Sequence, residues 1–257
     1  MKRYKKIGPI RICDIWFDTD AFLAASDPIT VLHSNSRLDE SGYDLRTVGK
    51  TFLLDISAEP DAIFHRFEAT SCRYRIRKAI KDGVQVKKAG TEAEVEEYIR
   101  FENAFCQERE IPGVTRDDLK ELDVFYAIDS GGGYLGGCAF LKSETEKLVR
   151  YKYGATLHKL NANEIILWEA ICHYHDLKYQ HFDFGGVHPT EDQTSYYYRH
   201  YSFKKKFGGE LIDSYCYYRL RGIYKPLFRC GKWFVDRFFA GDLNGATNWL
   251  NKLIKIK

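Results

Sequence analysis

The spacing of apolar residues in the first part of the chain predicts short strands separated by polar segments. β-Forming residues cluster or alternate over Ile10–Phe17 and Ile29–His33, and Thr51–Ile56 is a continuous apolar run. Each run has the length and composition of a strand. The polar stretch Ser34–Gly49 predicts a loop, and Pro60 suits the first turn of a helix that follows the third strand.

A basic helix is predicted next, with Ser71 as its N-cap and Gly83 as its stop. Arg73, Arg77 and Lys81 recur at every fourth position, so they share one face of this helix. A cationic face of this kind is either solvated or able to bind phosphate groups. The sequence alone leaves both interpretations open.

The middle of the chain predicts two helices followed by a β-meander. Thr91 is expected to cap the amphipathic helix Glu92–Gln107, and a short helix is expected at Asp117–Leu122. Glycines between Gly131 and Gly136 formally match the G-x-G-x-x-G pattern, but a strand follows them, which predicts a hairpin turn instead of a nucleotide-binding loop. The strands of the meander are expected at Phe125–Asp129, Tyr134–Lys142 and Leu148–Ala155.

The segment from residue 181 to residue 210 combines features that could build a reaction site. A short aromatic strand contains Asp183 and ends at a pair of glycines, Gly185 and Gly186. A helix is expected over Gln193–Phe207, with a second glycine pair as its stop and a Lys-Lys-Lys run in its last turn. Positive charge at a helix C-terminus suits the helix dipole and needs no functional explanation. The same lysines could instead stabilise an oxyanion beside the glycine-terminated strand.

Composition and charge limit the functional classes. The chain has 257 residues, 44% hydrophobic and 29% charged, which is ordinary for a soluble protein with a packed core. A net charge of +3 indicates no overall field for a nucleic acid, so any basic binding surface must be local. Dispersed cysteines without C-x-x-C spacing predict reduced thiols, and no apolar run approaches the ~18 residues of a membrane span. We therefore expect a cytoplasmic protein, either free or at the inner face of the membrane.

Two groups of potential metal ligands have simpler explanations. Asp18 and Asp20 match the D-x-D pattern of metal–nucleotide sites, but carboxylates before an alanine-rich turn are more typical of a helix N-cap. His173 and His175 are two residues apart on a predicted helix, so their side chains diverge. No cysteine or carboxylate is spaced to complete a tetrahedral site. The sequence therefore predicts no bound metal.

Ordered motifs in the last two thirds of the chain are its most distinctive feature. FDFGGV (residues 182–187) is followed by FKKKFGGE (residues 203–210), and two further motifs are RYRIRKAIKDGVQV (residues 73–86) and EIILWEAICHYHDLKYQHFDFGG (residues 164–186). Together they resemble the C-terminal signature, the basic linking helix and the preceding helix and strand of the FemAB family, whose members build peptidoglycan cross-bridges. The resemblance covers about Thr51–Leu220, and three motifs in the same order make it more specific than any one of them.

The resemblance implies an α/β protein with a mixed sheet and a GNAT-like acyltransferase fold. The predicted order of helix, helix, meander, helix, strand, helix and strand is the order of that fold. Residues 84–222 would form the GNAT-like transferase domain, and residues 1–83 a shortened N-terminal part that includes the basic linking helix. About eighty residues are too few for a complete first domain, so a truncated second GNAT-like half is expected there. Residues 223–257 would form aromatic and basic helices that pack onto the body or contact a membrane surface or RNA.

The resemblance also implies roles for individual residues. Lys204, in the Phe-Lys pair of FKKKFGG, matches the family's catalytic lysine best, Lys205 is the alternative, and Asp183 completes the expected catalytic group. Phe203 matches the aromatic residue that stacks on the terminal adenine of the donor. The other candidates for substrate binding are Gly185, Gly186, His188, Arg73, Arg77, Arg150, Lys152 and Tyr153.

The implied reaction transfers an aminoacyl group from aminoacyl-tRNA to an amine on a nucleotide- or lipid-linked precursor of the cell wall or a surface glycan, without a cofactor. The stretch GATLHKLNANE (residues 154–164) lacks the glycine pair with which CoA-dependent GNAT enzymes bind pyrophosphate, and this counts against acyl-CoA as donor. A CoA- or carrier-protein-dependent N-acyltransferase acting on an amino sugar stays open as the alternative. So does a catalytically silent binding module. The sequence indicates no oligomeric state.

Overall fold

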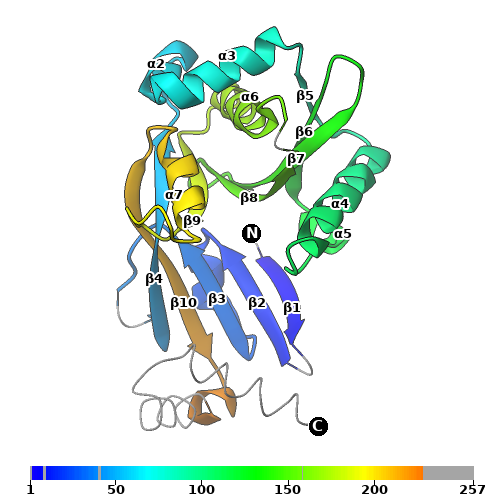
Figure 1. Cartoon of the computed structure of the whole chain (residues 1–257). Coiled ribbons are helices and arrows are strands. Elements are labelled where there is room, and N and C mark those ends of the chain that lie inside the picture. Colours follow the sequence, from blue (N-terminus) through cyan, green and yellow to red (C-terminus); the bar gives the residue numbers. More distant parts are fainter. Residues whose placement is uncertain (1, 8–9, 40–41, 158, 228–257) are drawn as a thin grey trace. The chain divides into compact units, whose positions relative to one another are not determined.

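The computed structural model describes residues 2–7, 10–39, 42–157 and 159–227 (Figure 1). The chain divides into two compact units, the first comprising Met1–Val48 with Tyr215–Lys257 and the second Gly49–Ser214. These divisions differ from the expected ones after residues 83 and 222, because the first unit combines both ends of the chain, and a linear reading of the sequence cannot join them. Most of the expected C-terminal helices, residues 228–257, lie outside the described residues, whereas residues 224–227 are helical.

The described part of the first unit is built on a small sheet. Antiparallel pairing joins β1 to β2 and β3 to β10, and β2 and β3 are parallel. The strands follow one another in the order β1 (Lys2–Ile7), β2 (Ile10–Trp16), β3 (Ile29–Ser34) and the end of β10 (Glu210–Leu220). The short helix α1 (Thr19–Ala24) begins where the Asp18 carboxylate accepts a hydrogen bond from the Ala21 amide at 2.9 Å. This confirms the N-cap interpretation of Asp18.

A mixed sheet forms the centre of the second unit. Its only parallel neighbours among the described strands are β8 and β9, which are joined by α6, and the other neighbours are antiparallel. A helix between parallel neighbours is the usual crossover connection. The spatial order is β4 (Leu45–Asp55), β9 (His181–Val187), β8 (Leu148–Thr156), β7 (Tyr134–Ser143), β6 (Leu122–Ile128) and β5 (Gln85–Lys88).

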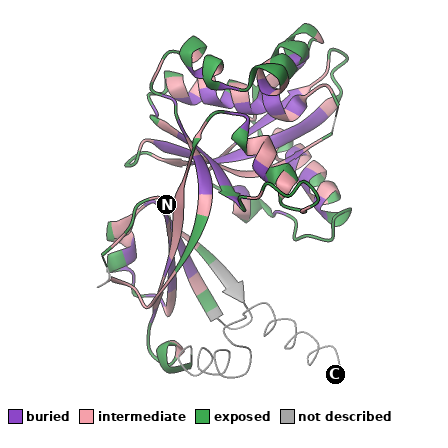
Figure 2. Ribbon diagram, turned by 60° about the vertical axis from the view of Figure 1, so that its left-hand side comes forward, coloured by how far each residue is buried: buried purple, intermediate pink, exposed green. Residues whose placement is uncertain are grey.

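Helices cover both faces of this sheet because its central strands alternate between two cores. On β7, Cys138 and Phe140 belong to the larger core, which includes buried residues of α3 and α6, and Ala139 between them belongs to the smaller core beside α4. Figure 2 shows that buried residues fill much of the strands of this sheet and recur along its helices. The helices of this unit are α2 (Pro60–Arg66), α3 (Tyr74–Lys81), α4 (Glu92–Gln107), α5 (Arg116–Leu119), α6 (Ala162–Asp176) and α7 (Tyr198–Lys205). None of the helices in the described part of the chain is long and apolar enough to span a bilayer.

The expected α/β fold with a GNAT-like order of elements is confirmed, and several boundaries differ. β4 begins at Leu45, inside the stretch predicted as a loop, and Thr47 and Val48 are exposed. An exposed strand end carries no apolar pattern, so the sequence did not mark it. The glycines after Asp129 form the predicted hairpin turn, in which the Asp129 carboxylate accepts hydrogen bonds from the Gly131 and Gly133 amides. The short helix α5 ends at Leu119, a turn follows at Lys120 and Glu121, and Leu122, the expected last residue of the helix, already begins β6.

Local side-chain hydrogen bonds explain two other differences. Ser71 does not cap the basic helix: it lies inside a π-helical segment, η2 (Ala69–Arg73), and its hydroxyl donates to the Glu68 carboxylate at 2.6 Å. The helix before the second glycine pair is shorter than expected and starts at Tyr198. Residues 193–197 form turns instead, because the Asp192 carboxylate accepts a hydrogen bond from the Thr194 amide at 2.9 Å.

Candidate active site

The candidate site lies where β8 and β9 separate. The two strands pair only from Leu148 opposite His181 to Arg150 opposite Asp183, although both are described along their whole length. Beyond this point each strand carries a β-bulge, an extra residue that bends the strand and turns its side chains.

The bulge on β8 places two tyrosines, Tyr151 and Tyr153, on opposite faces of the sheet. Ala139 is opposite Tyr153 and Phe140 is opposite Tyr151, so Lys152 is the extra residue. As a result, Tyr151 packs against the larger core and Tyr153 against the smaller one. Burial raises the pKa of the Tyr151 hydroxyl well above its ordinary value, so this group remains protonated and is not a general base.

The bulge on β9 lies at Gly185. Two steps along β4, from Thr51 to Leu53, correspond to three steps along β9, from Gly186 to Asp183. Gly185 adopts a φ of 77°, a left-handed conformation that glycine tolerates best. A Cβ atom at this position would also lie 2.9 Å from the carbonyl oxygen of Tyr151. The glycine is therefore required by both its conformation and its close approach to β8.

Asp183 holds this bulge from inside the protein. Its fully buried carboxylate accepts hydrogen bonds from the Gly185 amide at 2.7 Å and from the Arg150 guanidinium at 2.9 Å. The buried Thr51 hydroxyl lies within hydrogen-bond distance of both the Asp183 carboxylate and the Gly185 carbonyl. Asp183 thus holds the backbone of the turn formed by Gly185 and Gly186, which we call the glycine turn, and its contacts are those of a positioning residue.

Lys204 reaches the outer side of the same bulge from α7. Its ammonium donates hydrogen bonds to the carbonyl oxygens of Gly185 at 3.2 Å and Gly186 at 3.0 Å. Burial lowers the pKa of Lys204 to about 8, Asp183 opposes this shift, and Arg150 adds to it. A lysine ammonium has three N–H donors, so two carbonyl contacts leave one for a ligand.

The three consecutive lysines have different environments. Lys205 is exposed, and its ammonium lies 3.5 Å from the Glu191 carboxylate. Lys206 is buried and pairs at 2.6 Å with Glu164, whose carboxylate also accepts a hydrogen bond from Arg75 at 2.9 Å. Burial alone would raise the pKa of Glu164, but Lys206 and Arg75 lower it. Of the three lysines, only Lys204 contacts the glycine turn.

The other predicted site residues are distributed around this centre. Phe203 is half-buried, with its ring 5.5 Å from that of Phe207. His188 is exposed and packs against Tyr197, with their ring centroids 4.4 Å apart. Gly186 is exposed at the end of the turn.

The residues predicted to bind phosphate already contact other side chains of the protein. Arg150 is occupied by Asp183, and the Lys152 ammonium lies over the Tyr153 ring at 5.7 Å. At the end of η2, just before α3, the Arg73 guanidinium lies 3.1 Å from the His65 ring nitrogen. The guanidinium of the exposed Arg77 lies over the Phe64 ring at 5.3 Å. The structure therefore does not gather these four cations at the glycine turn.

The sequence analysis did not identify two residues that contact the bulge, Thr51 and Tyr151. It also did not predict the buried ion pair of Glu164 with Lys206. A threonine at the start of the apolar run TFLLDI was the available signal for Thr51. The β8 bulge that positions Tyr151 depends on pairing with β7, so no local sequence pattern predicts it.

Within the described ranges, no three His, Cys, Asp or Glu side chains converge as a metal site.

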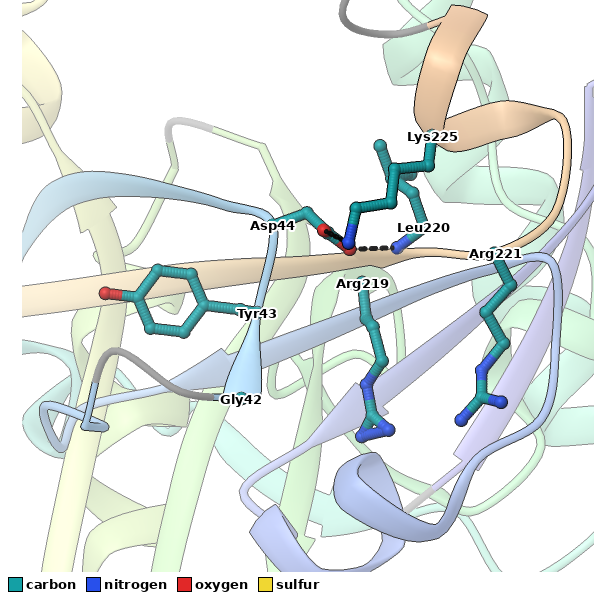
Figure 3. A pocket seen from close by; sticks show the side chains of 7 residues that line it. All are labelled: Gly42, Tyr43, Asp44, Arg219, Leu220, Arg221 and Lys225. Carbon is teal, nitrogen blue, oxygen red and sulfur yellow. Dashed lines mark hydrogen bonds and ion pairs between the residues drawn. The ribbon is translucent and has the colours of Figure 1, made fainter.

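A separate hollow of about 230 Å³ lies in the first unit (Figure 3). Its cations already have partners: Arg219 and Arg221 donate to carbonyls at the C-terminal end of α1. Lys225 pairs with Asp44 at 2.6 Å. Such contacts satisfy the free carbonyls of a helix end and explain the cluster as a cap. The hollow is lined by Gly42, Tyr43, Asp44, Arg219, Leu220, Arg221 and Lys225.

Comparison with known proteins matches the fold to solved structures. No protein-family model and no curated protein matches the sequence. The crystal structure of FemX superimposes with a TM-score of 0.67 and 13% identity, covering 89% of this chain and 85% of FemX. The fold is that of FemX. The resemblance to the FemAB family expected from the motifs is thereby confirmed at the level of the fold.

Two further solved structures share this fold. The C-terminal domain of a putative lysylphosphatidylglycerol synthetase from Agrobacterium fabrum has a TM-score of 0.57 and 12% identity, covering 91% of this chain and 85% of that one. The structure of L-PGS from Bacillus licheniformis has a TM-score of 0.58 and 11% identity, covering 88% and 82%. At identities this low, the similarity to FemX and to these two proteins establishes the fold and leaves the reaction to be argued from the site.

Proposed function

We propose that this protein is an aminoacyltransferase that moves an aminoacyl group from the ester of a charged tRNA to a primary amine. The observation that carries the proposal is the position of Lys204, whose ammonium is fixed by the Gly185 and Gly186 carbonyls with one donor left. The FemX-like fold and the FDFGGV and FKKKFGGE motifs support the same assignment.

The reaction needs a group that stabilises negative charge. The amine nitrogen attacks the ester carbonyl, and its carbonyl oxygen becomes an oxyanion. When the intermediate collapses, the bond to the ribose oxygen breaks, that oxygen takes up a proton, and the amine nitrogen loses one. The remaining N–H of Lys204 would donate to the oxyanion, because a fixed cation in a partly dry site stabilises developing charge without reorganising. Asp183, Arg150 and Thr51 would keep the turn in the geometry that fixes this ammonium.

For the acceptor, we propose an amine on a nucleotide- or lipid-linked precursor of the cell wall or a surface glycan. Arg73 and Arg77, on the outer side of the second unit, are candidates for phosphate contacts of such a precursor. No cofactor is needed, since the ester of the donor supplies the free energy of the transfer. We further propose a cytoplasmic location, at the inner face of the membrane when the acceptor is lipid-linked.

The donor can be identified in one assay. Purified protein is incubated with bulk tRNA charged with radiolabelled amino acids, or with radiolabelled acetyl-CoA, and with two acceptor probes: UDP-glucosamine and phosphatidylethanolamine in mixed micelles. The proposal predicts labelled amide from charged tRNA that disappears after RNase treatment. Label transferred from acetyl-CoA, and not from tRNA, would contradict the proposal and favour the CoA-dependent alternative.

A further inference from the structure

Aromatic side chains are unusually exposed just before and within α7. Tyr196 is 75% exposed and Tyr197 is 48% exposed. His188 and His200 are exposed as well. Large rings on a protein surface mark interaction sites when they lie together, whereas single exposed rings need no explanation. We call His188, Tyr196, Tyr197 and His200 the aromatic platform.

The rings of the platform contact one another in a chain. The ring centroids are 4.4 Å apart between His188 and Tyr197, 5.5 Å between Tyr196 and Tyr197, and 5.8 Å between Tyr196 and His200. These are normal separations for interacting aromatic pairs. The rings therefore support one another and keep faces open to solvent without a ligand.

The platform leads to the candidate catalytic lysine. His200 and Lys204 are four residues apart on α7, so their side chains lie on one side of the helix. Tyr196, in the turn before the helix, reaches this side through its contact with the His200 ring. The Lys204 ammonium is close enough to contribute to the lowered pKa of His200, after the larger effect of partial burial. At a helical rise of 1.5 Å per residue, Lys204 lies about 6 Å further along α7 than His200.

Phe203, which the sequence suggested as the stacking residue, offers less free surface. Its ring is half-buried and packs against Phe207. The buried Lys206 ammonium lies 4.3 Å from the centre of the Phe203 ring. Planar ligands stack on free faces, so the exposed rings of the platform are better suited than Phe203.

Both positive and negative side chains lie around the platform, and the positive ones are able to contact a phosphate backbone. Arg199 and Lys205 are exposed beside it. Glu191 pairs with Lys205, and Asp192 is exposed on the loop before Tyr196. Only a short run of phosphates therefore meets positive charge here, which fits a few nucleotides better than a long duplex.

We propose that the aromatic platform stacks the unpaired 3′-terminal bases of the donor tRNA. The donor's identity rests on the proposed function, and the platform adds how its end is held. The Tyr196 and His200 rings are 5.8 Å apart, and Lys204 lies about 6 Å further along α7, so about three nucleotides fit at roughly 3.4 Å each along one strand. A strand bound in this way delivers its terminal ribose, and the ester on it, to the ammonium of Lys204.

Binding of a short RNA tests this site without depending on catalysis. The probe is the tetranucleotide ACCA with a 5′ fluorophore, and anisotropy gives Kd for the full-length protein. Tyr196→Ala and Tyr197→Ala are expected to weaken binding about fivefold or more each, the effect of losing one stacked base. Tyr74→Ala is the matched control, because Tyr74 is an exposed tyrosine on α3 (58%) outside the platform. Thermal melts verify that each variant is folded.

A second measurement separates this site from the proposed function. With an aminoacylated minihelix as donor, Tyr196→Ala should raise KM about fivefold or more and change kcat little, because stacking is lost equally in the ground and transition states. One outcome is that wild-type protein transfers from the minihelix while the platform variants bind ACCA and turn over like Tyr74→Ala. This result would contradict the proposed binding site and leave the proposed reaction supported. If wild-type protein fails to bind ACCA, the platform is overturned too. If ACCA binds through the platform and no transfer from tRNA occurs, the site stands and the proposed reaction falls.

Discussion

The ammonium of Lys204 lies 3.2 Å from the carbonyl oxygen of Gly185, although nineteen positions separate the two residues along the chain. Gly185 presents this oxygen because it forms the bulge of β9 with a φ of 77°. The buried Asp183 carboxylate holds the amide of the same residue. The lysine is thus positioned by a turn that the core itself fixes.

Replacing Gly185 tests whether this turn is needed. Gly185→Ala should destabilise the protein by about 1–2 kcal/mol, the cost of a left-handed conformation with a Cβ. A clash with the Tyr151 carbonyl, 2.9 Å from that Cβ, would add to this cost. Gly186→Ala is the control, because a Cβ there meets nothing within 4 Å. Urea unfolding of both variants gives the free energies, and equal losses would show that the bulge is not the cause.

Asp183 should contribute to stability as well as to the geometry of the site. Asp183→Asn leaves the Arg150 guanidinium, which is 2.9 Å from the carboxylate, without its ion-pair partner in a largely buried place. Breaking such a pair typically costs about 3 kcal/mol. We expect this loss in urea unfolding, and a change within about 0.5 kcal/mol for the exposed Asp176→Asn. A near-neutral Asp183→Asn would mean that the carboxylate is not needed to hold the turn.

Adjacent lysines should differ in their effect on unfolding. Lys206→Met removes the closer of the two cations that contact the buried Glu164 carboxylate, at 2.6 Å, and should cost about 3 kcal/mol. Lys205→Met removes only an exposed ion pair, for which less than about 0.5 kcal/mol is expected. The difference is measurable as a shift in Tm of several degrees. Similar Tm values for the two variants would argue against the buried pair.

The lowered pKa of Lys204 predicts a pH dependence of stability. Burial lowers it from 10.5 to about 8 in the folded protein, so between these values the unfolded chain binds more protons at this residue. The free energy of unfolding contributed by Lys204 therefore rises with pH across this window. Methionine does not titrate, so wild-type protein should gain stability relative to Lys204→Met from pH 8 to pH 10.5. A constant difference between the two proteins would show that the pKa is not lowered.

The sequence predicted the fold well where local patterns carry the information. The cap at Thr91, the meander and the strand of Asp183 are all present, because capping boxes and apolar runs are local signals. The exposed beginning of β4 and the joining of both chain ends in the first unit were missed, since neither has a local signal.

The sequence predicted which residues form the candidate site better than it predicted how they are arranged. The motifs pointed to Lys204, Asp183 and the glycine pair, and these residues lie together. Which of the lysines faces the turn depends on how α7 packs against β9, and the role of Thr51 depends on a neighbouring strand far away in sequence. These contacts depend on the tertiary arrangement of the sheet, so no local sequence pattern predicts them.

The central claim, that the Lys204 ammonium stabilises the oxyanion of the transfer, is tested most directly by single-turnover kinetics. The measurement is the rate of label transfer from charged tRNA to UDP-glucosamine by wild-type protein, Lys204→Ala and Lys205→Ala, all shown to be folded by circular dichroism. The account predicts a loss of about 100-fold or more for Lys204→Ala, the usual cost of one oxyanion donor, and a rate within about twofold of wild type for Lys205→Ala. A folded Lys204→Ala that transfers at the wild-type rate would contradict it.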